Sequence, residues 1–335
     1  MWRTFGHDRA VHLLQRSLAE GRLSHAYLLA GPHQVGKTTL ALDLAQAVNC
    51  LDCPNPCEQC GQCSRISRGL HADVQVVGLA SAQPDSGRSR VSIGIDQVRE
   101  VQRESSLKPY EGKCRVFIFD GAEHLSDEAA NSLLKTLEEP PEQVLLLLLT
   151  SDSAALPATV VSRCQILELR PLARSLIASH LVAHFNADDE TADKIARLSN
   201  GRPGWAIEAS SRPEVLVHLS KKVGAIEAVA RDGMEKRFAY AADLASAVAR
   251  DRASGRRELA LWLTWWRDVL LVKNGVPGFV THLSSLETLQ TVDGALSSRQ
   301  VTQAINAIRR TADYLERNIN PRLALEAMML DLPRP

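Results

Sequence analysis

A nine-residue loop near the amino terminus has the composition of a phosphate-binding site. The sequence GPHQVGKTT at 31–39 fits the pattern G-x-x-x-x-G-K-[ST]. Glycines let the backbone turn so that successive N–H groups point into one concavity, and the start of a following helix adds partial positive charge. In such loops the lysine reaches the β- and γ-phosphates and the hydroxyl that follows it binds Mg²⁺. We therefore expect a nucleoside triphosphate to bind the loop, whose candidate residues are Gly31, Pro32, His33, Gln34, Val35, Gly36, Lys37, Thr38 and Thr39.

Five of the seven cysteines lie close together, between Cys50 and Cys63. Cys57, Cys60 and Cys63 supply three thiolates at C-x-x-C spacing, and either Cys50 or Cys53 supplies a fourth. Four cysteines with this spacing suit tetrahedral Zn²⁺ in a closed structural site. A redox C-x-x-C pair and disulfides are the alternatives, and a reducing cytosol disfavours disulfides. We expect one structural Zn²⁺ that takes no part in catalysis.

Two polar residues follow apolar stretches further along the chain. Asp120 ends the β-branched and aromatic stretch 115–119, and Thr150 follows the leucine-rich stretch 144–149. An aspartate at the end of such a strand, downstream of a phosphate loop, holds Mg²⁺ through water. Because ligands bind at the carboxyl ends of parallel strands, we expect Asp120 and Thr150 to lie at the same edge of a sheet as Gly31.

The segments that must position these residues alternate between strands and helices. Expected strands are 26–30, 73–77, 115–119 and 144–149, and expected helices are 10–19, 39–48, 95–105 and 126–139. This alternation predicts a parallel sheet covered on both faces. Beyond residue 170 the strand signals vanish, and helices are expected at 174–185, 189–199, 213–230, 235–250, 256–272, 283–295, 299–318 and from 321. We expect an α/β plus α protein.

Length and charge narrow the class of protein further. A chain of 335 residues is too long for one ordinary core, so two or three domains are expected. Lys+Arg and Asp+Glu both total 39, so the formal net charge is zero. This balance argues against a protein that binds nucleic acid through a large net positive charge. The amino terminus leads into an amphipathic helix instead of a signal peptide, and the longest apolar run, 144–149, is too short to cross a bilayer. We expect a soluble cytoplasmic protein with no membrane partner.

Several stretches follow one another in the order and spacing of one known family. They are GRLSHAYLLAGPHQVGKTTLA at 21–41, the cysteine segment, NSLLKTLEEPPE at 131–142 and ATVVSRC at 158–164, with weaker matches at 200–204 and 320–326. This pattern resembles the clamp-loader subunits of bacterial DNA polymerase III, which are AAA+ proteins. The resemblance implies an AAA+ core of RecA type at 1–170 with a zinc knuckle at 50–63, a helical lid at 171–211 and a helical collar at 212–335.

The same resemblance implies a function in DNA replication. Clamp-loader subunits form a heteropentamer of tau/gamma, delta and delta-prime subunits within the DNA polymerase III holoenzyme, a nucleotidyltransferase complex. The ring uses ATP with Mg²⁺ to open a sliding clamp and set it on primed DNA. The expected partners are therefore the other subunits, the clamp and, through the complex, primed DNA.

Two departures from the motor subunits of that family imply weak ATP hydrolysis. The tau/gamma motor subunits carry a Glu that orients the attacking water, directly after the strand-end Asp, and a lid arginine that touches the γ-phosphate. Here Gly121 follows the strand end, Glu123 is expected to point elsewhere, and Gly204 stands where the arginine would be. This pattern is similar to the delta-prime class, although the intact phosphate loop keeps ATP binding open. An active tau/gamma-type motor ATPase and a non-catalytic scaffold with a vestigial site are the alternatives.

The triplet Ser162-Arg163-Cys164 has an expected role outside its own nucleotide site. The resemblance places this triplet at the edge of the protomer, with Arg163 facing the nucleotide of the neighbouring subunit. A guanidinium there stabilises the charge that develops on the transferring γ-phosphoryl group. We expect Arg163 to be an arginine finger that acts in trans; an ordinary surface arginine is the alternative.

Overall fold

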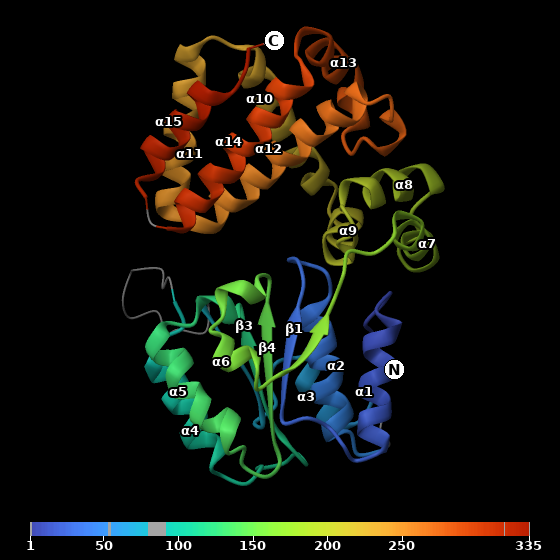
Figure 1. Cartoon of the computed structure of the whole chain (residues 1–335). Helices are drawn as coiled ribbons and strands as arrows, with labels where there is room; N and C mark the ends of the chain where they lie inside the picture. Colours follow the sequence, from blue (N-terminus) through green and yellow to red (C-terminus); the bar gives the residue numbers. More distant parts are fainter. Residues whose placement is uncertain (1, 53–54, 80–91, 318, 335) are drawn as a thin grey trace. The chain divides into compact units, whose positions relative to one another are not determined.

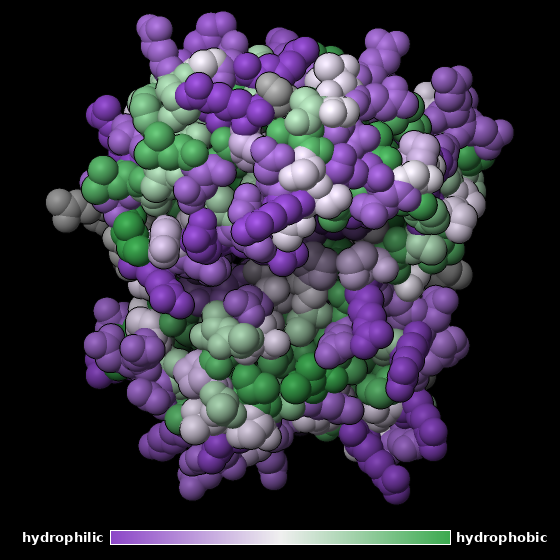
Figure 2. All heavy atoms as spheres, turned by 45° about the horizontal axis from the view of Figure 1, so that its top comes forward, coloured by the Kyte–Doolittle hydropathy of each residue, from purple (hydrophilic) through white to green (hydrophobic). Residues whose placement is uncertain are grey.

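The chain folds into two compact units, Met1–Ile207 and Glu208–Pro335, drawn in Figure 1. The computed structural model describes residues 2–52, 55–79, 92–317 and 319–334. Within these ranges, no helix is long and apolar enough to cross a bilayer. Hydrophobic side chains lie among hydrophilic ones on the face shown in Figure 2.

The first unit is built on a five-stranded parallel sheet. Its strands are β1 (Ala26–Ala30), β2 (Val74–Gly78), β3 (Arg115–Asp120), β4 (Val144–Thr150) and β5 (Gln165–Glu168), in the order β2-β3-β4-β1-β5. Every neighbouring pair is parallel. The four expected strands are confirmed to within one residue at each end. Their carboxyl ends lie together, because Ala30 pairs with Thr150 and Gly78 with Asp120.

Side chains of the strands alternate between two hydrophobic cores, one on each face of the sheet. On one face Leu28, Phe119 and Leu148 pack with helices α4 (Ile95–Ser105), α5 (Asp127–Glu138) and α6 (Ala158–Val161). On the other face Leu29 and Leu147 pack with α1 (Asp8–Ala19), α2 (Lys37–Asn49) and α3 (Gly61–Ser67). Figure 1 shows these two groups of helices on opposite sides of the sheet. The predicted sheet with both faces covered is confirmed, and α3 is a helix that the sequence analysis did not predict.

Three further helices belong wholly or in part to the first unit: α7 (Arg174–Phe185), α8 (Asp189–Leu198) and α9 (Pro203–Ser211). Helices α7 and α8 pack on each other, and Arg174 of α7 forms an ion pair with Asp193 of α8. The segment that leads into α7 is tied to the start of α9, because the Leu172 N–H donates to the Gly201 carbonyl at 2.8 Å.

The described part of the second unit is helical throughout. Its helices are α10 (Pro213–Arg231), α11 (Met234–Arg250), α12 (Arg252–Lys273), α13 (Leu286–Ala295), α14 (Ser298–Glu316) and α15 (Pro321–Asp331), with short 3₁₀ turns η4 (Pro277–Phe279) and η5 (Leu283–Ser285). Trp262, Trp265 and Trp266 of α12 are fully buried in its core. The expected α/β plus α fold class is confirmed, while the division into three domains at 170 and 211 stays a prediction.

A buried arginine holds the end of the second unit in place. The Arg237 guanidinium is fully buried, and its partners among the described residues are five backbone carbonyls, those of Val229, Ala230, Met329, Leu332 and Pro333. The last carbonyls of a helix lack partners within the helix and carry partial negative charge. Arg237 therefore satisfies the carboxyl ends of α10 and α15 at once, without a carboxylate.

Candidate nucleotide site and cysteine cluster

The loop between β1 and α2 has the tight backbone that the sequence predicts for a phosphate loop. Gln34 and Gly36 have φ angles of 60° and 114°, in the left-handed region, and α2 begins directly afterwards at Lys37. A Cβ atom on Gly31 would lie 2.2 Å from the carbonyl oxygen of Leu169, so only glycine fits there. The loop therefore turns sharply at the carboxyl end of β1, with its N–H groups at the start of a helix.

Lys37 lies inside this loop. Its side chain is buried, and its ammonium group donates to the carbonyl oxygens of Gly31 and Pro32, the latter at 2.9 Å. Burial lowers the pKa of Lys37, and the carboxylates of Glu123 and Asp120 oppose that effect. The ammonium group is thus held at the position from which a lysine can reach phosphate.

The other loop residues divide into anchoring and exposed ones. Val35 is buried, and its carbonyl oxygen lies 2.8 Å from Nε2 of His7 in the amino-terminal segment. His33 and Thr38 are exposed, and Thr38 stands in the first turn of α2. The Thr38 hydroxyl is therefore accessible for the Mg²⁺ that such loops bind.

Asp120 and Thr150 lie at the same edge of the sheet as the loop, as the last residues of β3 and β4. Asp120 is exposed, whereas Thr150 is fully buried. The Thr150 hydroxyl is engaged in a local turn, since it donates to the carbonyl of Asp152 at 2.8 Å and accepts from that residue's N–H at 3.1 Å. The structure places the phosphate loop and both strand ends together, as the parallel topology requires.

Glu123, which the sequence analysis set aside, points to the end of β4. Its Oε1 accepts hydrogen bonds from the hydroxyl and the N–H of Ser151, the latter at 3.2 Å. Burial raises the pKa of Glu123, but the hydrogen bonds from the hydroxyl and the N–H of Ser151 outweigh burial, so the pKa is lowered. The 3₁₀ turn η2 (Ala122–His124) follows Gly121 at φ 81° and directs Glu123 there. The sequence shows that a glycine stands at position 121, but it does not predict the direction in which the turn places Glu123.

The start of α9 contacts the phosphate loop through the backbone of Gly204. The Gly204 N–H donates to the carbonyl oxygen of Gln34 at 2.9 Å. A Cβ atom on Gly204 would lie 2.9 Å from that oxygen and 3.2 Å from Cβ of Gln34. The position at which the resemblance places an arginine in motor subunits therefore has no room for a side chain. Arg202 is held elsewhere, by the carbonyl of Ser199 at 2.8 Å.

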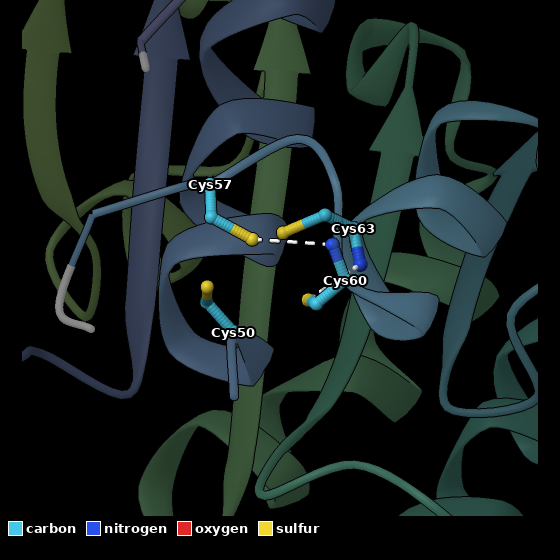
Figure 3. A group of neighbouring side chains, drawn as sticks. All are labelled: Cys50, Cys57, Cys60 and Cys63. Carbon is cyan, nitrogen blue, oxygen red and sulfur yellow. Dashed lines mark hydrogen bonds between the residues drawn. The ribbon is translucent and has the colours of Figure 1, made fainter. Parts of the chain in front are cut away.

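Four cysteines of the predicted knuckle converge on one point. In Figure 3 the side chains of Cys50, Cys57, Cys60 and Cys63 face a common space, and their sulfurs all lie within 4.8 Å of one another. Sulfurs bound at about 2.3 Å to a tetrahedral Zn²⁺ lie about 3.8 Å apart. A small decrease in the distances between these sulfurs would therefore give the geometry of a zinc site. The Cys60 N–H donates to Sγ of Cys57 at 3.2 Å, and the Cys63 N–H to Sγ of Cys60 at 3.5 Å. This donor set fits a metal that prefers thiolates.

Among the described residues, none of these four cysteines forms a disulfide. Burial raises the pKa of Cys63 to about 12, so this thiol stays protonated at neutral pH unless a cation binds. Cys50 directly follows α2 and completes the group of four, while Cys53 lies outside the described residues. The cluster could bind a metal ion; its assignment to Zn²⁺ stays a prediction.

Comparison with known proteins decides the family. A family model described as "DNA polymerase III, delta subunit" matches residues 6–173, half of the chain. The DNA polymerase III subunit delta' of Bacillus subtilis (strain 168) is 30% identical over 97% of this chain and 95% of its own length. The chain belongs to the clamp-loader subunit family of DNA polymerase III.

Other clamp-loader subunits match over a smaller part of their own length. The tau subunit of the same Bacillus strain is 24% identical over 98% of this chain but 60% of its own. The tau subunit of Escherichia coli (strain K12) is 37% identical over 50% of this chain and 25% of its own. A solved gamma subunit-related protein of Thermotoga maritima has a TM-score of 0.42 at 16% identity, covering 96% of this chain and 97% of that one.

In this clamp-loader subunit Arg163 lies between α6 and β5, with its side chain 36% exposed. Its guanidinium forms an ion pair with Glu138, the last residue of α5, at 2.6 Å and donates to the carbonyl of Thr159 at 2.9 Å. Ion pairs exposed to this degree contribute little, about 0–1 kcal/mol. The guanidinium can therefore leave this pair for a stronger anion at small cost.

Proposed function

We propose that this chain is the delta-prime-type subunit of a DNA polymerase III clamp loader. The observation that carries the proposal is the extent of the alignment with Bacillus subtilis delta', which covers nearly the whole of both chains. The tau alignment leaves 40% of that subunit unmatched, since it covers 60%. Gly121 and Gly204 support the same conclusion, because they replace the two groups that motor subunits use for hydrolysis.

In this role the subunit joins tau/gamma and delta subunits in a five-membered ring at the bacterial replisome, in the cytoplasm. The ring opens the sliding clamp and sets it on primed DNA. The collar helices α10–α15 supply contacts to the other subunits.

The subunit binds ATP with Mg²⁺ and hydrolyses it poorly. The backbone of the phosphate loop and Lys37 hold the β- and γ-phosphates, and Thr38 and Asp120 hold Mg²⁺. Thr150 supports the strand end beside them. The cysteines Cys50, Cys57, Cys60 and Cys63 hold one structural Zn²⁺, and Arg163 reaches the nucleotide of the neighbouring subunit.

Reconstitution tests the proposal directly. Purified chain is mixed with tau and delta subunits of the same source, ring formation is checked by size, and clamp loading on primed DNA is measured with and without this chain. We expect loading only when the chain is present. Full loading by tau and delta alone, or a ring that forms without this chain, contradicts the proposal.

Two measurements on the isolated chain separate the alternatives. Fast ATP turnover would identify a tau/gamma-type motor subunit. Failure to bind an ATP analogue in equilibrium titration, together with normal clamp loading by the ring, would identify a scaffold whose nucleotide site is vestigial.

A further inference from the structure

Glu123 is held firmly at the carboxyl end of the sheet. It lies in the turn η2 directly after β3, and Ser151 directly after β4 binds its Oε1 through two donors. The Ile93 N–H also fixes this turn, since it donates to the His124 carbonyl at 2.7 Å. The carboxylate therefore bridges the two strand ends that carry Asp120 and Thr150.

The second oxygen of this carboxylate, Oε2, is buried and has no hydrogen-bond partner among the described residues. A buried charged acceptor without a partner is costly, so such atoms call for a ligand, water or functional explanation. The anchored Oε1 and the free Oε2 together give a carboxylate with a fixed orientation and one open acceptor.

The carboxylate of Glu123 lies at the edge of the sheet where the nucleotide is expected. Glu123 follows Asp120, the last residue of β3, by three positions, and it is bound by Ser151, which follows Thr150, the last residue of β4. The phosphate loop leaves β1 at the same edge, because Ala30 pairs with Thr150. A negative charge at this place repels a bare triphosphate and attracts the hydrated cation that accompanies it.

We propose that Glu123 is a second acidic group of the nucleotide site, whose open oxygen and charge favour the hydrated Mg²⁺ of a bound nucleoside triphosphate over the metal-free nucleotide. Ser151 is the positioning residue that keeps the carboxylate in place. This inference rests on the proposed nucleotide binding. It assigns to Glu123 selectivity for the Mg²⁺ complex, which is separate from orienting a water for hydrolysis.

The ratio of two affinities tests the inference without any measurement of turnover. A fluorescent ATP analogue is titrated into the full chain in Mg²⁺ and, separately, in EDTA. Glu123→Gln keeps the shape of the side chain and removes its charge. We expect the preference for the Mg²⁺ complex to fall about tenfold in this variant, the size expected for one hydrogen bond to a charged group. In EDTA the variant should bind the analogue as well as wild type or more tightly.

Two further variants keep the result interpretable. Ser151→Ala should lower the same preference by a smaller factor, because it loosens the carboxylate without removing it. Glu142→Gln removes an exposed charge from the turn before β4, at the opposite edge of the sheet, and should leave both affinities unchanged. Thermal unfolding of each variant checks that it is folded.

The possible outcomes separate this inference from the function on which it rests. Wild type that binds no analogue would overturn both. Normal wild-type binding with an unchanged preference in Glu123→Gln would overturn the role of Glu123 alone. An equal loss of affinity in Mg²⁺ and in EDTA would also overturn it, since a merely structural role weakens both.

Discussion

Arg163 is bound by its own chain, yet only weakly. Its ion pair with Glu138 is exposed to solvent, and its remaining contacts are to the Thr159 carbonyl and the Ser162 hydroxyl of the same short helical segment. An arginine finger must exchange such contacts for a phosphate of another subunit. The weak pair is compatible with that exchange, whereas a buried pair would oppose it.

Arg163→Ala should leave the folding and nucleotide affinity of the isolated chain unchanged, because the side chain is exposed and lies on α6–β5 instead of the phosphate loop. In a reconstituted ring, DNA-stimulated ATPase and clamp loading should fall. A finger contributes roughly 10³–10⁵ in rate, and a ring with several sites should lose less. Steady-state ATPase of rings of verified size provides the measurement.

Glu138→Ala is the matched control for that change. It removes the same ion pair but keeps the guanidinium, so the ring should retain its activity. If both variants lose activity equally, the loss results from breaking the ion pair, and Arg163 does not act as an arginine finger. A fully active Arg163→Ala ring would make Arg163 an ordinary surface arginine.

At the scale of elements, the amino end of α9 and the phosphate loop are in direct backbone contact. The hydrogen bond from Gly204 to the Gln34 carbonyl leaves no space for a Cβ atom. An arginine introduced at position 204 would therefore meet the backbone of the phosphate loop. We expect that such a substitution does not restore ATP hydrolysis.

Gly204→Arg should lower stability and leave ATP turnover slow. Overpacking of this kind costs roughly 1–3 kcal/mol, measurable as a loss in the free energy of unfolding in urea. Gly224→Ala in α10 is the control, since a Cβ there meets no atom within 4 Å and should stabilise the helix by up to about 1 kcal/mol. A Gly204→Arg chain that is stable and hydrolyses ATP quickly would contradict this account.

The cysteine cluster joins the end of α2 to the start of α3. If it holds Zn²⁺, chain purified without added metal should contain one Zn²⁺ per molecule by elemental analysis. Cys60→Ser should abolish that metal and destabilise the first unit, while the helical second unit stays folded. Cys164→Ala, outside the cluster, should retain the metal. Wild type without metal and with four titratable thiols would rule out the site.

Asp73 organises the loop before β3. Its buried carboxylate accepts the N–H groups of Tyr110, Glu111 and Gly112 at 2.7–2.8 Å and lies 3.5 Å from the Arg115 guanidinium. Burial raises the pKa of Asp73, but these donors and the guanidinium outweigh burial, so the pKa lies below its usual value. The ionised carboxylate therefore stabilises the fold.

A carboxyl group with a lowered pKa in the fold stabilises above its unfolded pKa of about 3.9, and this stabilisation is lost as the pH falls through the folded value. Asp73→Asn should therefore reduce the free energy of unfolding at pH 7 by roughly 1–3 kcal/mol. Below about pH 4 the difference from wild type should shrink. Urea unfolding from pH 3 to 7 measures both. A difference independent of pH would exclude the ionised carboxylate as its cause.

At the scale of the whole molecule, the chain combines an intact phosphate loop with glycines at the two positions where the resemblance places hydrolytic groups of motor subunits, Gly121 and Gly204. Under the proposed function, the contribution of this chain to a clamp loader depends on other subunits. Its own site would bind nucleotide, and Arg163 would act at the adjacent site.

The isolated chain should therefore bind an ATP analogue yet turn ATP over far more slowly than the roughly 1–100 s⁻¹ of typical kinases. Lys37→Ala should weaken binding, because it removes the buried cation of the phosphate loop. Lys221→Ala, an exposed residue of α10, serves as control. Phosphate release measured on the monomer tests this, and turnover in the kinase range contradicts the delta-prime assignment.

The sequence by itself determined the features that depend on neighbouring residues in the chain. The phosphate loop, the apolar strands such as 144–149, the helix α4 and the C-x-x-C spacing are all local patterns. Their physical causes are local too: glycine conformations, the periodicity of buried side chains and ligand spacing. For this reason the predicted strands lie within one residue of the observed ones.

Only the tertiary structure decided which distant residues meet. The contact of Glu123 with Ser151 depends on the direction of a turn at positive φ, which a glycine permits but does not specify. The contact of Gly204 with Gln34 joins residues far apart in the chain, where packing alone sets the distance. Cys50 lies beside the three cysteines of the C-x-x-C segment because α2 ends beside α3. Such contacts arise when whole helices and strands pack against one another. They therefore cannot be predicted from patterns of neighbouring residues in the sequence.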